Sequence, residues 1–226
     1  MAEINRNNAY RTVALLSYRD GSSVKIATGV FLLRKDGTPY LATAAHFAKA
    51  APSSTLIELP NGVGQKPSLF RLSDLTLGHR FDSAVADLSV YPLTGIKPTE
   101  QKYFTSRFIV QDAILGDTNL PVDREKQLTV FGYPSGLGHD SKGALVPLSF
   151  RTYASSDYFY LKDPDYKDNL LVYALENASI GGYSGAPVFA MDGPRNGIVG
   201  FVKGNLNSEQ GSISLVTPAA FAKFLL

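Results

Sequence analysis

Residues 181–189 read Gly-Gly-Tyr-Ser-Gly-Ala-Pro-Val-Phe, a glycine-rich turn that leads into an apolar run. Glycines on both sides of Ser184 let the backbone approach another group closely and turn its N–H groups inward. Such donors can stabilise the oxyanion that forms when a serine hydroxyl attacks a carbonyl carbon. The same residues also fit an ordinary β-turn, so the chemical interpretation requires a base that activates Ser184.

The sequence offers three histidines as this base: His46, His79 and His139. All three precede Ser184, whereas in an α/β-hydrolase the nucleophile comes first, followed by the acid and then the histidine. The chain order therefore excludes an α/β-hydrolase and leaves open the order histidine, acid, serine. His46 ends the run Tyr-Leu-Ala-Thr-Ala-Ala-His, an extended segment that breaks into a small-residue turn. We interpret His79 and His139 as loop residues.

The pattern along the chain indicates an all-β protein. Short runs rich in Val, Ile, Leu, Tyr and Phe recur between turn residues, which is typical of a sandwich or a barrel. Asp36-Gly37 predicts a hairpin because both residues tolerate positive φ. Two strand series are separated by residues 93–125, which show no sustained periodicity. We expect a first barrel over 10–92, a crossing over 93–125, a second barrel over 126–216 and a C-terminal helix over 217–226, with Thr217 as its N-cap.

Composition limits the partners. With 22 basic and 20 acidic residues the formal charge is +2, and no basic block predicts a nucleic-acid partner. Tyrosines and lysines do alternate over 153–173, but interspersed aspartates favour a barrel hairpin with an acidic loop. Cysteines are absent, which excludes disulfides and thiolate metal sites, and we expect neither a metal nor a cofactor. No apolar stretch approaches the ~18 residues of a membrane span.

The N-terminus lacks the pattern of a signal peptide, so the expected location is cytoplasmic. A secreted or periplasmic location would follow if Met1 had been placed on a chain whose signal was already removed.

Three segments together resemble the signatures of trypsin-like, chymotrypsin-fold serine proteases, and more closely the bacterial cysteine-free members. They are Leu-Ala-Thr-Ala-Ala-His at 41–46, Asp-Ser-Ala-Val at 82–85 and Gly-Tyr-Ser-Gly-Ala-Pro-Val at 182–188. Phe-Gly-Tyr-Pro-Ser-Gly at 131–136 is similar to a turn in the second barrel of HtrA-type peptidases. The resemblance implies two six-stranded antiparallel β-barrels with a short C-terminal helix, all within one peptidase domain.

Carried over residue by residue, the resemblance implies that Ser184 is the nucleophile, His46 the general base and Asp82 the carboxylate that orients it. The amides of Gly182 and Ser184 would form the oxyanion hole. Asp87 is the competing acid. Its odd offset from Asp82 would place it on the opposite face of a continuous strand, so we prefer Asp82.

The resemblance also places the primary substrate pocket at Ala178, Gly200 and Val202. An uncharged floor at Ala178 and a narrowing Val202 predict a small or medium apolar side chain before the scissile bond. The expected function is that of a serine endopeptidase acting on proteins or peptides, with a regulatory partner protein as a further expectation. A catalytically silent protease-fold binding module and a serine esterase with the same triad remain alternatives.

Overall fold

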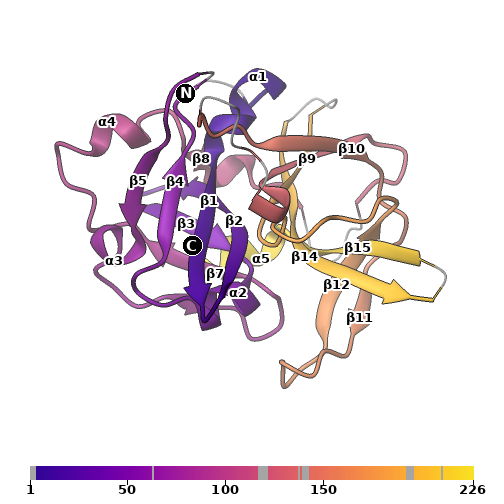
Figure 1. Cartoon of the computed structure of the whole chain (residues 1–226). Helices are drawn as coiled ribbons and strands as arrows, with labels where there is room; N and C mark the ends of the chain where they lie inside the picture. The colour runs from indigo at the N-terminus through magenta and orange to yellow at the C-terminus, as the bar shows by residue number, and fades with distance from the viewer. Residues whose placement is uncertain are drawn as a thin grey trace.

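The structure is a computed structural model that describes residues 4–62, 64–116, 122–136, 138, 143–191, 196–209 and 211–226. Its strands form two antiparallel sheets, apart from one short parallel pair, and each sheet makes up one half of the molecule (Figure 1). This arrangement confirms the all-β, two-barrel chymotrypsin-like fold expected from the sequence. The sheets hold eight and seven strands where six each were expected, and the two-residue strands β6 and β8 account for the difference in the first sheet.

The first sheet has the order β5-β4-β1-β2-β3-β7-β6, and β8 pairs in parallel with β2. Its strands are β1 (Val13–Asp20), β2 (Ser23–Leu33), β3 (Pro39–Thr43), β4 (Leu56–Leu59), β5 (Ser68–Arg71), β6 (Phe81–Asp82), β7 (Ser89–Pro92) and β8 (Ile109–Val110). The predicted hairpin at Asp36-Gly37 joins β2 to β3. Gly37 has a φ of 87° there and donates its amide to Arg34 O.

The second sheet has the order β10-β9-β13-β14-β15-β12-β11. Its strands are β9 (Leu128–Gly132), β10 (Leu148–Thr152), β11 (Phe159–Leu161), β12 (Leu170–Leu175), β13 (Pro187–Ala190), β14 (Gly197–Ser208) and β15 (Gly211–Pro218). Between the sheets the chain leaves the first at β8, and Ile114 then forms a bridge to Ile198 of the second. The stretch that shows no periodicity in the sequence thus runs from one sheet to the other.

Helices are short throughout the described part of the chain. They are α1 (Arg6–Ala9), α2 (Ala45–Ala50), α3 (Leu72–Leu75), α4 (Gln101–Phe104) and α5 (Ala220–Leu225), with 3₁₀ turns η1 (Tyr10–Thr12), η2 (Gln111–Ala113) and η3 (Pro134–Gly136). The expectation that Thr217 caps the last helix is wrong. Thr217 pairs with Phe201 in the β14–β15 ladder, which keeps its backbone extended, and α5 starts three residues later without a side-chain cap.

Apolar side chains from both sheets form one shared core between the two halves. Val13 and Val30 of the first sheet, Phe189 and Phe201 of the second, and Phe221 of α5 all belong to it. Each half also has its own core on the far side of its sheet. Burial of apolar area is worth roughly 25 cal/mol per Å², so the shared core fixes how the halves meet. A site whose residues come from both halves can therefore keep a defined geometry.

Candidate active site

His46 lies in the first turn of α2, immediately after strand β3. Alanines at 44, 45 and 48 favour a helix here, and the buried side chains of Phe47 and Ala48 anchor it to the first sheet. The imidazole itself projects from the packed face, and 41% of the side chain is exposed. The sequence thus places a histidine on a firmly held helix with its ring free to reach a substrate.

The carboxylate of Asp87 holds His46 at two points. One oxygen, Oδ2, lies 2.6 Å from the imidazole Nδ1, and the other, Oδ1, accepts the backbone amide of His46 at 2.8 Å. The Asp87 side chain is fully buried, with 0% exposure. An amide in the first turn of a helix has no partner within the helix, so Asp87 satisfies it and orients the ring at the same time.

The charged form of Asp87 is stabilised despite its burial. Burial alone raises the pKa of this carboxyl, but the hydrogen bonds and charge of His46, together with the hydroxyl of Tyr166, outweigh it and lower the pKa below its ordinary value. A carboxylate of this kind fixes the imidazole with Nδ1 protonated, which leaves Nε2 free to accept a proton.

The expectation that Asp82 orients His46 is wrong. Asp82 accepts two hydrogen bonds from the guanidinium of Arg80, at 2.6 and 2.9 Å, and a third from the hydroxyl of Ser89. Arg80 in turn donates to the carbonyl of Ala48 in the last turn of α2. Asp82 therefore supports the far end of the helix that carries His46, whereas the imidazole Nδ1 pairs with Asp87.

The preference for Asp82 assumes one continuous strand, but residues 84–91 do not form one. Strand β7 begins only at Ser89, and residues 84–87 form a series of bends between β6 and β7. The amide of Ser83 bonds to the carbonyl of Leu88, which closes this excursion. The even–odd rule for strand faces does not apply across such a turn, and Asp87 is free to point at α2.

Ser184 reaches the first half of the molecule through the backbone around it. Its carbonyl accepts the amide of Thr28 on β2 at 2.9 Å, and the hydroxyl of Thr28 donates to Gly182 O at 2.9 Å. A Cβ added at Gly185 would lie 2.7 Å from the amide nitrogen of Ala44, two residues before His46. The nucleophile turn thus packs directly against the segment that leads into α2.

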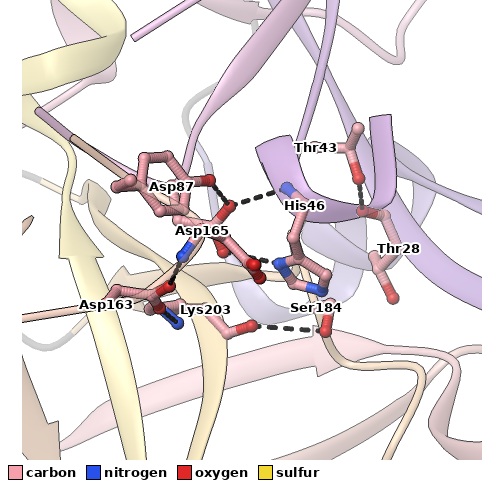
Figure 2. Close-up of polar contacts among 9 residues, drawn as sticks. Thr28, Thr43, His46, Asp87, Asp163, Asp165, Ser184 and Lys203 are labelled. Carbon is pink, nitrogen blue, oxygen red and sulfur yellow. Dashed lines mark hydrogen bonds and ion pairs between the residues drawn. The ribbon is translucent and has the colours of Figure 1, made fainter. Parts of the chain in front are cut away.

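In Figure 2 the imidazole of His46 lies between the carboxylate of Asp87 and the side chain of Ser184. The Ser184 hydroxyl donates to the carbonyl of Lys203 at 3.3 Å. Ser184 is partly exposed, while Asp87 is buried behind the ring. The order carboxylate, imidazole, hydroxyl is the order that a proton relay to a serine nucleophile requires.

Two backbone amides of the nucleophile turn are candidate oxyanion donors. Neither the amide of Gly182 nor that of Ser184 donates to an acceptor among the described residues. The carbonyl of Gly181 accepts the amide of Ser135, and a trans peptide points its C=O and N–H in opposite directions, so the Gly182 N–H faces away from Ser135. Gly182 has a φ of 101°, and a Cβ there would lie 2.9 Å from Ser135 N. Only glycine fits this position.

The expected pocket residues are not brought together. Val202 is 1% exposed and packs with Tyr173 and Val216 in the core of the second sheet. A Cβ at Gly200 would meet the hydroxyl oxygen of Tyr173 at 2.6 Å. Positions 200 and 202 lie on the same face of β14, which packs on Tyr173 and Val216 in the barrel interior, so their assignment to the pocket wall is wrong. Ala178, the expected floor, is exposed.

Asn205 of β14 bonds to Ser179, the residue that follows Ala178. Its Oδ1 accepts the amide and the hydroxyl of Ser179 at 3.1 and 2.8 Å, and its Nδ2 donates to Ser179 O at 2.5 Å. From β15, the hydroxyl of Ser214 donates to Asn177 O at 2.7 Å. These bonds tie the segment before the nucleophile turn to the β14–β15 hairpin.

Thr28, Tyr166 and Lys203 contribute to the site, but no sequence motif predicts their part in it. Thr28 is fully buried within an otherwise apolar stretch of β2, and a lone buried-looking threonine is a weak signal for a hydrogen-bonding role. Asp87, the competing acid of the sequence, stands two residues before β7, and this position next to an apolar run is the signal for a buried acid. Tyr166 and Lys203 contact the site only through the tertiary fold, and no local pattern marks them.

The other two histidines lie elsewhere. His79 is exposed in the segment between α3 and β6, and His139 lies outside the described residues. Within the described ranges, no three His, Asp or Glu side chains converge in a way that could hold a metal ion. No described helix is long and apolar enough to cross a bilayer.

Comparison with solved structures places this geometry in a known fold. No protein-family model and no curated protein sequence matches the chain. The protease domain of MamO from Magnetospirillum magneticum superposes with a TM-score of 0.62 at 15% identity, covering 97% of both chains. The HtrA-type protease AlgW, solved with a tripeptide, gives 0.57 at 16% identity and covers 96% of this chain and 59% of its own.

A scabies mite inactivated protease paralogue gives a TM-score of 0.60 at 16% identity, covering 95% of this chain and 92% of its own. The fold is therefore that of the trypsin-like serine proteases. Because an inactivated paralogue shares it, the fold does not decide activity, and the residues of the site must do so.

Proposed function

We propose that this protein is a serine endopeptidase in which Ser184 is the nucleophile, His46 the general base and Asp87 the orienting acid. One observation carries the proposal: Asp87 bonds to both the Nδ1 and the backbone amide of His46. The imidazole ring lies between this carboxylate and Ser184 (Figure 2). An Asp–His pair that served only the fold would not require a serine in a glycine-rich turn on the other side of the ring.

In the proposed reaction, His46 Nε2 takes the proton of the Ser184 hydroxyl as its oxygen attacks the substrate carbonyl carbon. The negative charge that develops on the carbonyl oxygen is stabilised by the amides of Gly182 and Ser184. The imidazolium, stabilised by Asp87, then returns the proton to the leaving amine, and an acyl-enzyme remains. Water activated by the same histidine hydrolyses this ester and restores Ser184.

Before substrate binds, the Ser184 hydroxyl donates a hydrogen bond to the carbonyl of Lys203. A substrate amide that takes this acceptor would release the hydroxyl, which could then rotate to His46. Such a change needs one side-chain torsion, and catalytic hydrogen bonds in unliganded enzymes are often long or misaligned until substrate binds.

We further propose that the enzyme accepts only a small uncharged side chain before the scissile bond. The Asn205 carboxamide bonds to Ser179, the residue after Ala178, which the resemblance places at the floor of the pocket, and no charged residue lies among Asn177, Ala178 and Ser179. This deepens the expectation from the sequence but rests on different residues.

A fluorophosphonate probe tests the proposal because it reacts with activated serines. Wild-type protein should be labelled at Ser184, as located by mass spectrometry of the digested protein, whereas Ser184→Ala and His46→Ala should not be labelled. Ser212→Ala, at an exposed hydroxyl on β15, is the matched control and should label normally. Absence of labelling in the wild type would favour a binding module instead. Labelling with turnover of ester but not amide substrates would favour an esterase.

A further inference from the structure

Tyr166 contributes a contact to Asp87 that lies outside the proposed triad. Its hydroxyl donates to Asp87 Oδ1 at 2.5 Å, on the same oxygen that accepts the His46 amide. Asp87 belongs to the segment before β7 of the first sheet, whereas Tyr166 lies between β11 and β12 of the second. The contact therefore crosses from one half of the molecule to the other.

The segment that carries Tyr166 is fixed on the side of the second sheet. Asp163 forms an ion pair with Lys203 at 2.7 Å, and the two side chains are only 12% and 16% exposed. The other carboxylate oxygen of Asp163 accepts the amide of Asp165 at 2.9 Å, which forms the turn that leads into Tyr166 (Figure 2). The carbonyl of the same Lys203 accepts the Ser184 hydroxyl.

On the side of the first sheet, the ring of Tyr166 packs against α2. The ammonium of Lys49 lies 4.0 Å from the ring centroid, a cation–π contact made one turn after His46 on the same helix. The ring is thus held between the helix that carries His46 and the carboxylate that orients it. Burial and the adjacent negative charge of Asp87 raise the pKa of the Tyr166 phenol, so its hydroxyl keeps the proton that it donates.

We propose that Tyr166 is a positioning residue of the active site. Its hydroxyl donates a third hydrogen bond to the Asp87 carboxylate and holds the carboxylate in the plane that His46 requires. The expected effect on kcat rests on the proposed function, whereas the expected effect on the hydrogen bond between Asp87 and His46 does not. The hydroxyl matters because a buried carboxylate needs several donors to remain charged and fixed. Without it, Oδ1 would keep only the His46 amide, and the carboxylate could rotate away from Nδ1.

The substitution Tyr166→Phe removes this hydroxyl and keeps the ring that packs on Lys49. A hydrogen bond to a charged group contributes enough that we expect kcat to fall about 10- to 100-fold, with KM changed less than threefold. Tyr160→Phe is the matched control because Tyr160, on β11 of the same hairpin, is 73% exposed and lies outside the site. It should retain wild-type kcat. Thermal unfolding should show that both variants are folded.

A second readout does not depend on catalysis. Proton NMR of the wild type should show a low-field resonance from the hydrogen-bonded Nδ1 proton of His46, and His46→Ala should identify it by its loss. In Tyr166→Phe this resonance should shift and broaden as the carboxylate loosens, while in Tyr160→Phe it should stay in place. If the wild type hydrolyses no peptide, the proposed function fails, and the NMR comparison alone decides the role of Tyr166. A folded Tyr166→Phe protein with an unchanged resonance and unchanged kcat would overturn the inference.

Discussion

Asp87 binds His46 through both its carboxylate oxygens, one at the imidazole Nδ1 and one at the backbone amide. The second bond ties the acid to the helix as well as to the ring. The same carboxylate accepts the Tyr166 hydroxyl from the second half of the molecule. Asp87 thus connects the helix that carries His46 to the half that carries Ser184.

The amide of Gly182 tests the oxyanion site. In Gly182→Ala a Cβ would collide with backbone near Ser135, and the φ of 101° would be strained. The peptide must then shift, so we expect kcat to fall about 10²- to 10³-fold, as for loss of an oxyanion donor. Gly181→Ala is the comparison for folding, since a Cβ there has nothing within 4 Å and should leave the melting temperature unchanged. A Gly182→Ala enzyme with wild-type kcat would show that this amide takes no part in the reaction.

Asn205 tests the proposed restriction on substrate size. Asn205→Gly removes the carboxamide that bridges to Ser179, which opens the space beside Ala178. We expect kcat/KM for a peptide with leucine before the scissile bond to rise at least tenfold relative to one with alanine, since pocket contacts of this size are worth about 1–3 kcal/mol. Asn207→Gly, two residues along the same strand, should leave this ratio unchanged. The size restriction is refuted if both variants give the wild-type ratio.

The Asp163–Lys203 ion pair predicts a pH dependence of stability. Burial tends to raise the pKa of Asp163, but the hydrogen bond from Lys203 outweighs it and lowers the pKa below its ordinary value. A lowered folded-state pKa gives stability that is present above the unfolded pKa of about 3.9 and is lost as pH falls through the folded value. In urea unfolding, the wild type should therefore lose more stability than Asp163→Asn between pH 5 and pH 2.

The control for this experiment is Asp112→Asn. Asp112 pairs with Lys35 on the surface, where the two side chains are 75% and 70% exposed, and exposed pairs contribute little. This variant should follow the wild-type curve. Parallel curves for the wild type and Asp163→Asn would contradict the assigned role of the Asp163 carboxylate.

The fold was predictable from local patterns because strand alternation and turn residues are properties of neighbouring residues. The Asp36-Gly37 hairpin formed as expected, since glycine at positive φ decides it locally. The candidate nucleophile and base were predictable for a different reason: glycines flank Ser184, and the sequence has only three histidines. His46 and Ser184 do come from opposite halves, as the sequence suggested.

The remaining site residues depend on features that do not repeat along the sequence. Alternation along one strand favours Asp82 as the acid, but bends over 84–87 interrupt the strand, so the alternation does not hold there. Gly200 and Val202 do not line the pocket because they face the barrel core, and the register of β14 with β15 shifts between Val202 and Gly204. Tyr166 reaches Asp87 across 79 residues of sequence and from the other sheet. Only the packed structure brings such residues together.

The identity of the acid tests the account most directly. The measurement is kcat/KM on one peptide substrate for Asp87→Asn and Asp82→Asn, with folding checked by circular dichroism. We predict that Asp87→Asn loses about 10⁴-fold because the imidazole takes the wrong tautomer, while Asp82→Asn stays within tenfold of the wild type. If Asp82→Asn lost most of its activity while Asp87→Asn kept it, Asp87 would not be the carboxylate that orients His46.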